Sequence, residues 1–144
     1  MGLTSNEILT QLKTQLDNEL TYPIFLGIRE ELTQFPCIII EPIGIAEGVD
    51  GEAVYNRVDA TLTVGIYGYV RVHNKDKQII GDSNTKGVVD VARDIKLAID
   101  SDRTLSGKAI HTTIIDTVFS IVDYPFREVQ VNLEILYRQT KGVR

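Results

Sequence analysis

The chain has 144 residues, a length that suits one folded unit, and we expect a single domain over residues 1–144. Hydrophobic residues make up 43% and charged residues 24% of it, values that do not indicate intrinsic disorder. The formal net charge of −5 argues against a sequence-independent grip on nucleic acid, which needs clustered lysine and arginine. Cys37 is the only cysteine, so an intrachain disulfide is excluded and a reducing compartment fits.

The first residues predict an amphipathic helix. Thr4 and Glu7 have the spacing of a capping box, in which each side chain satisfies a free backbone donor at the helix start. A helix of about 16 residues is expected to end before Tyr22–Pro23, because proline disfavours helical geometry in the residue before it. This segment lacks the pattern of a signal peptide, and no run approaches the roughly 20 apolar residues of a membrane span, so no membrane partner is expected. The apolar stripe consists of Ile8, Leu9, Leu12, Leu16 and Leu20.

The next segment is less regular. Residues 24–28 fit a short strand and residues 29–33 a single helical turn, while residues 37–41 predict a buried strand because they form a short β-branched run between prolines. Residues 43–55 predict an exposed loop that carries Glu47, Asp50 and Glu52. These acids lack the alternation of a calcium loop, so a solvated loop is the favoured interpretation.

Residues 57–72 alternate apolar and polar side chains over sixteen positions, which predicts one long strand. At about 3.3 Å per residue such a strand spans roughly 50 Å, whereas typical strands have about 5–6 residues. We therefore expect part of it to project beyond the domain body. Tyr67 and Tyr69 lie on the polar face, where they are either a subunit contact or ordinary surface tyrosines.

The second half of the chain predicts a polar loop at residues 73–78, a helix with an apolar stripe from Val88 to Ile99, and a turn at residues 100–107. Strands are predicted at residues 109–123 and 127–139, joined through Tyr124–Pro125. The later strand alternates cleanly, as in a sheet with one packed and one wet face. The whole pattern predicts an α+β fold: a mostly antiparallel sheet, two helices on one face, and a long projecting strand or hairpin.

Catalytic groups do not converge anywhere in the sequence. The motifs of nucleophile elbows, phosphate loops, dinucleotide folds and zinc proteases are missing, so we expect no enzyme, no catalytic residues, no cofactor and no metal. His73 is interpreted as a solvated loop residue and His111 as a structural strand residue. Two isolated histidines without an acidic neighbour make a weak case for zinc. Cys37 is interpreted as a buried, inert thiol.

The order of these features resembles the tail terminator, or minor tail, proteins of long-tailed bacteriophages. The resemblance covers nearly the whole chain and rests on several modest motifs in sequence. An opening helix is followed by Phe35–Pro36 and an aliphatic strand, and then by an acidic loop and a long strand that begins with arginine. A second helix ends in an Asp-x-Thr-Leu-x-Gly turn at residues 102–107, the most specific motif, and the last strand closes with Leu136–Tyr137.

The resemblance implies a structural virion protein that forms a ring, usually of six subunits, at the head-proximal end of the tail tube. Such a ring stops tube polymerisation and offers a docking surface to the head connector, so the implied partners are further copies, the tube protein and the connector protein. DNA passes through the ring without specific binding, and assembly takes place in the host cytoplasm. Contact with a neighbouring subunit or the tube is expected through Tyr67, Tyr69, Arg71, His73, Lys75 and Lys77.

The loop acids Glu47, Asp50 and Glu52 are expected to face the lumen or the partner ring, because negative charge keeps DNA from adhering. Two alternatives stay open. One is another phage part, namely a head–tail joining protein, a neck protein or a tube subunit. The other is a small ligand-binding or enzymatic α+β domain, which needs a cavity with converging polar groups.

Overall fold

The computed structural model of the chain describes residues 3–27, 31–47 and 57–140. Its five strands form one sheet in the order β1-β2-β3-β5-β4, in which β1 runs parallel to β2 and the other neighbours are antiparallel. This confirms the predicted α+β fold with a mostly antiparallel sheet. In chain order the elements are α1 (Ser5–Glu19), β1 (Ile24–Leu26), β2 (Cys37–Glu47), β3 (Arg57–Arg71), α2 (Lys75–Ile79), α3 (Val88–Asp100), β4 (His111–Ile121) and β5 (Phe126–Thr140).

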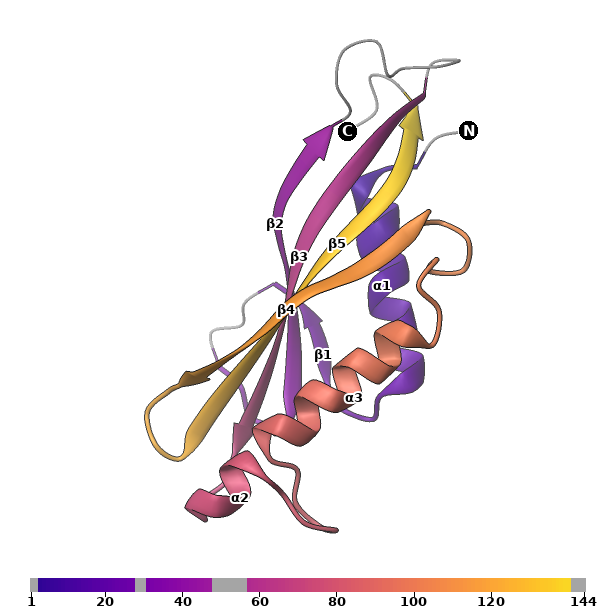
Figure 1. Ribbon diagram of the computed structural model, residues 1–144. Coiled ribbons are helices and arrows are strands. Elements are labelled where there is room, and N and C mark those ends of the chain that lie inside the picture. Colours follow the sequence, from indigo (N-terminus) through magenta and orange to yellow (C-terminus); the bar gives the residue numbers. More distant parts are fainter. Residues whose placement is uncertain (1–2, 28–30, 48–56, 141–144) are drawn as a thin grey trace.

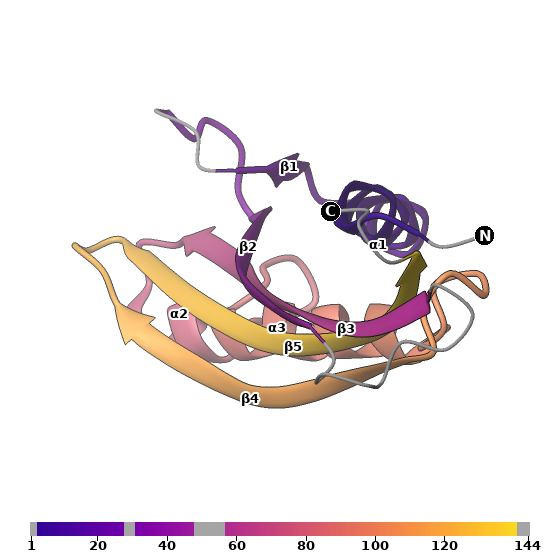
Figure 2. The ribbon, with the colours of Figure 1, turned by 90° about the horizontal axis from the view of Figure 1, so that it is seen from above.

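The sheet curves around α3, and α1 lies on the same side of it (Figures 1 and 2). The alternating apolar residues of β3 from Ala60 to Val70 and of β5 from Val129 to Tyr137 point to this side and are buried, as the period-two pattern predicts. The helices contribute their apolar stripes to the same core, which confirms that both long helices cover one face. Fully buried side chains include Ile8, Leu12 and Leu16 of α1, Val91, Ile95 and Ile99 of α3, and Leu62, Ile66, Leu133 and Tyr137 of the sheet.

Helix α1 begins as its sequence predicts. The backbone N–H of Glu7 donates to Thr4 Oγ1 at 3.3 Å, which is the first half of the predicted capping box. The Glu7 side chain differs from the prediction, because its Oε1 accepts from the Thr4 hydroxyl at 3.3 Å and not from a backbone N–H. The helix ends at Glu19, before Tyr22–Pro23.

The long strand β3 is confirmed, and its neighbour β5 has the same length of 15 residues. The two strands pair from Arg57 opposite Thr140 to Arg71 opposite Phe126, so every residue of β3 has a partner within the chain. Strand β2 pairs with β3 on the other side, from Cys37 opposite Tyr69 onward. We expected part of β3 to project beyond the domain body because of its length, but β5 matches that length within the chain, so the length of β3 alone does not require a partner from another subunit.

Three local predictions were wrong at their boundaries. The loop predicted for residues 43–55 is a strand through Glu47, because β2 continues past Pro42 through a bulge; residues 48–56 lie outside the described residues. The loop predicted at residues 73–78 contains the short helix α2, which Asn74 begins by accepting backbone N–H groups from Asp76 and Lys77. The helical turn predicted for residues 29–33 is not present in its described part, residues 31–33.

Gly68 sets the distance between β3 and α3. A Cβ atom added there would lie 2.7 Å from Val91 Cγ1, closer than real contacts allow, and 3.1 Å from Val129 Cγ1, which is a tight contact. The glycine thus lets the helix approach the strand directly, which brings the apolar stripe of α3 onto the centre of the sheet.

Candidate assembly surface

Tyr67 and Tyr69 lie on the face of β3 that points away from the helices, as predicted. In the sheet register they stand opposite Gln130 and Glu128 of β5, and both side chains are partly buried. The ring of Tyr67 lies back over Gly65, where an added Cβ atom would come within 2.9 Å of Tyr67 Cε2. The phenol end of the ring therefore covers its own strand at Gly65.

The phenol of Tyr69 is held within the subunit. Burial and a hydrogen bond to Glu128 raise the pKa of Tyr69 far above its ordinary value, so the hydroxyl is neutral and donates to the carboxylate. Tyr69 and Glu128 are opposite each other in the sheet register, so this contact lies across β3 and β5 on the outer face. A replacement at Tyr69 would thus disturb the fold, whereas Tyr67 offers a cleaner test of an interface.

Arg71, His73, Lys75 and Lys77 lie where β3 ends and α2 begins, a region called here the basic corner. Arg71 and His73 are exposed. Lys77 forms an ion pair with Asp82 at 2.8 Å, and the hydrogen bond from Lys77 lowers the pKa of Asp82 to about 2. Part of this positive charge is therefore balanced inside the subunit.

Tyr124 belongs to the basic corner, although sequence reasoning assigned it only to a turn. Its hydroxyl donates to the backbone carbonyl of His73, and the two rings meet edge to face with centroids 6.0 Å apart. Lys75 Nζ stands 6.0 Å from the centroid of the Tyr124 ring, at the outer range of a cation–π contact. The β4–β5 turn thus positions the basic residues that follow β3.

The predicted acidic loop is only partly visible. Glu47 is the last residue of β2 and is exposed, while Asp50 and Glu52 lie outside the described residues. The expectation that these acids face a lumen or a partner ring stays a prediction.

Exposed apolar side chains lie on β4 from Ile115 onward and on the turn after it. Ile121 is 83% exposed, and at the same end of the molecule Ile80, just after α2, is 69% exposed. Sequence analysis missed this surface, although the apolar residues there follow one another without the alternation of a strand that has one wet face. The other exposed members are Ile115, Val118, Phe119, Val122 and Ile79.

The Asp-x-Thr-Leu-x-Gly motif forms a tight turn after α3. Asp102 accepts hydrogen bonds from the backbone N–H groups of Thr104 and Ser106, which lower the pKa of its carboxyl together with the Thr104 hydroxyl. Leu105, Ser106 and Gly107 all have positive φ angles of 50°, 59° and 81°, and this backbone turns the buried Leu105 side chain into the core. The motif therefore has a structural role.

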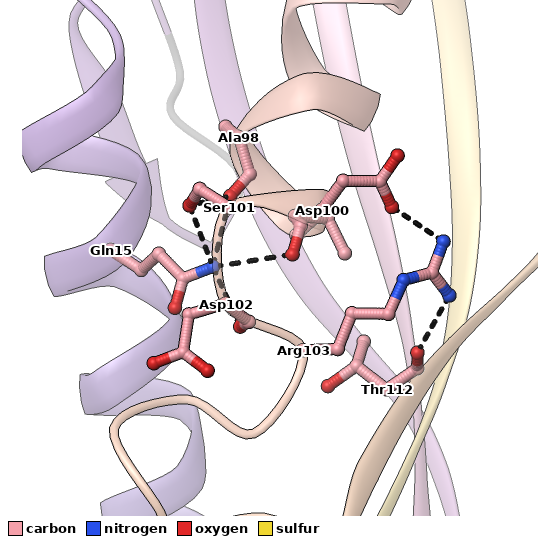
Figure 3. Close-up of polar contacts among 8 residues, drawn as sticks. Gln15, Ala98, Asp100, Ser101, Asp102, Arg103 and Thr112 are labelled. Atoms are coloured by element: carbon pink, nitrogen blue, oxygen red, sulfur yellow. Dashed lines mark hydrogen bonds and ion pairs between the residues drawn. The ribbon is translucent and has the colours of Figure 1, made fainter.

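Gln15 joins this turn to α1 (Figure 3). Its amide nitrogen donates to the carbonyl oxygens of Ala98 and Asp102, both at 2.9 Å, and so caps the end of α3. On the other side of the turn Arg103 pairs with Asp100 and donates to the carbonyl of Thr112 at 3.0 Å. The most specific motif of the sequence is thus tied to both helices and to β4.

The structure gives little support to a small-molecule site. A hollow of about 280 Å³ between α1 and α3 is lined by Tyr22, Lys86 and Asp94, among other residues. The Tyr22 hydroxyl donates to the Asp94 carboxylate, and Lys86 Nζ lies 3.1 Å from the same carboxylate, so these polar groups bind one another. His111 is exposed on β4, and among the described residues no aspartate or glutamate is buried. The described part of the chain also holds no group of three metal-ligating side chains.

No described helix combines the length and apolar character that crossing a bilayer requires. Neither family models nor curated proteins match the sequence. Among solved structures, one chain of the virion of a native gene transfer agent particle is similar in fold, with a TM-score of 0.54 and 8% sequence identity. The match covers 88% of this chain and 91% of that chain, so it extends over the whole domain.

Proposed function

We propose that this chain is a structural protein of a phage-like particle, and that it forms a ring at the head-proximal end of the tail tube. There it stops tube polymerisation and offers a docking surface to the head connector. The ring acts through the shape of its interfaces and carries out no chemical step.

The observation that carries the proposal is the fold similarity to a chain of a gene transfer agent virion. The match covers 88% of this chain and 91% of the other. Coverage this high is expected when both chains are single-domain subunits with the same fold. The sequence adds the order of motifs that resembles tail terminators. In particular, the turn at residues 102–107 is a rigid element with its own hydrogen bonds, so its sequence is constrained by the fold.

Exposed apolar side chains also support an assembly role. Contiguous apolar surfaces mark contacts with other proteins, and Ile121 and Ile80 are among several exposed apolar side chains at one end of the subunit. The basic corner adjoins this surface through Tyr124, so one end of the subunit combines apolar and positively charged groups.

Electron microscopy of the purified protein tests the proposal. A terminator is expected to form closed rings of uniform diameter, alone or on the ends of tail tubes. A tube subunit, the main alternative, forms long filaments by itself. The observation of filaments would therefore refute the terminator role and favour a tube subunit. A head–tail joining protein would instead bind the connector and leave tube length unregulated.

A further inference from the structure

Both edges of the sheet present strand backbone that is not paired by other described residues. At one edge, β1 pairs with β2 only as far as Leu26 opposite Ile40, and residues 42–46 of β2 continue beyond it. At the other edge, β4 pairs only with β5 among the described residues. The two edges lie on opposite sides of the upper half of the sheet in Figure 1.

Each edge carries only part of the usual protection. Natural edge strands are blocked by lysine, proline, β-bulges, inward charges or covering segments, because open strands pair with other chains. Strand β4 has a bulge between Ile114 and Asp116, and β2 has Pro42 and a bulge between Pro42 and Gly44. Strand β4 has no lysine, arginine or proline over its 11 residues, and Ile115 in its bulge is 46% exposed. In β2, Ile43 and Ile45 are 55% and 50% exposed, and Pro42 and the bulge beside it lie at the start of the open backbone.

The open stretches lie at the same height along the strands. Gly44 is opposite Thr63, which is opposite Glu134, which in turn is opposite Thr113, so one row crosses the sheet from edge to edge. A second row, two residues further along β2, joins Ala46 to His111 through Thr61 of β3 and Leu136 of β5. A second copy placed alongside in the same orientation therefore meets β4 with residues 42–46 of β2 without a large shift along the strands.

The directions of the strands fit as well. From β2 to β4 the sheet has four strands that alternate in direction, so β4 runs opposite to β2. Copies related by rotation about an axis along the strands therefore place β4 beside β2 in antiparallel orientation, the more stable form of pairing. Residues 42–46 and 111–115 contain no acidic or basic side chain except His111, so no like charges oppose the contact.

We propose that copies of this chain join edge to edge, with β4 of one subunit adding to residues 42–46 of β2 in the next, so that their sheets become continuous. The inference rests on the proposed ring and names its subunit contact. The contact is heterologous, because it joins two different patches of the same chain, and a heterologous contact repeats around a ring.

Paired cysteines test this contact directly. Ala46 and His111 are exposed on the outer face and lie in one row, so the two side chains of neighbouring copies come within the roughly 4.4–6.8 Å between Cα atoms that a disulfide allows. The double variant Ala46→Cys/His111→Cys is oxidised, or treated with a short bis-maleimide that also spans adjacent rows. The native Cys37 does not compete because it is fully buried.

The double variant is expected to give a ladder of covalent oligomers that ends at the ring. An equal mixture of the two single variants is expected to give dimers and nothing larger, because each copy then carries one reactive edge. As a second arm, Ile115→Lys places a charge in the β4 bulge and is expected to reduce self-association at least tenfold. Leu97→Lys is the matched control, since Leu97 is 60% exposed on α3, away from both edges.

The outcomes separate the contact from the function. Rings without a ladder, or rings that Ile115→Lys leaves intact, would overturn edge pairing while the terminator role stands. A ladder that extends into open filaments would support edge pairing and overturn the terminator role. A protein that stays monomeric at high concentration and gives no ladder would overturn the contact.

Discussion

Gln15 is a buried polar side chain that fastens α1 to the end of α3, and its replacement tests how the fold is held together. The side chain is 7% exposed and donates to the carbonyl oxygens of Ala98 and Asp102 at 2.9 Å (Figure 3). Gln15→Met keeps most of the volume but removes the donor. Two hydrogen bonds worth about 1 kcal/mol each then disappear, so the free energy of unfolding is expected to fall by about 2 kcal/mol.

The change is measured by urea unfolding followed with circular dichroism, or by thermal unfolding. For a chain of 144 residues, a loss of about 2 kcal/mol corresponds to a Tm lower by roughly 4–8 °C. Gln11→Met is the control, because Gln11 makes one contact, to Ser106 Oγ at 3.3 Å, outside the buried part of the helix contact. If both variants lose the same small amount, below about 0.5 kcal/mol, Gln15 does not hold the two helices together.

Three further changes follow from the packing, the charges and the outer face. Gly68→Ala is expected to destabilise the fold by about 1–3 kcal/mol in chemical unfolding, because the new methyl group meets Val91. The control Gly44→Ala has free space around the new methyl group and should change the free energy of unfolding by less than about 0.5 kcal/mol. Equal effects of the two variants would refute the close approach of α3 to β3. Asp90 accepts backbone N–H groups of Gly87 and Gly81 at 2.9 and 2.8 Å, and these bonds lower its pKa below the ordinary value of about 3.9. The contribution of the Asp90 carboxylate to stability is therefore present above about pH 4 and lost as the pH falls through the lowered pKa of the folded state. Asp90→Asn should consequently lose less stability on acidification than the unchanged protein does. The same pH profile for both proteins would contradict this. Tyr67→Asp should leave circular dichroism and ring formation unchanged, because Tyr67 lies on β3 away from both sheet edges, but should weaken the binding of rings to tail tubes in co-sedimentation; unchanged binding would remove Tyr67 from the tube contact.

Periodicity predicted the parts of the fold in which burial alternates. In β3 and β5 every second side chain enters the core, so both strands could be predicted with nearly correct ends. Helix α1 was predictable from Thr4 and Glu7, because their hydrogen bonds are local. The continuation of β2 beyond Pro42 was not, since the bulge there breaks the alternation and the strand depends on pairing with distant β3.

The candidate surface was less predictable than the fold. Tyr67 and Tyr69 were placed on the correct face by alternation, but the bond from Tyr69 to Glu128 depends on a register that joins residues far apart in sequence. The hydrogen bond from Tyr124 to the backbone of His73 was unpredictable for the same reason, because the fold brings together residues that are far apart in sequence. Open edges cannot be read from one strand at a time, because an edge exists only once the order of all strands is known.

Native mass spectrometry of the purified protein, alone and with tail tubes, tests the central claim most directly. The account predicts one discrete assembly with a fixed copy number, expected to be six, beside the free subunit. A continuous series of increasing copy numbers, or a monomer under both conditions, would contradict it.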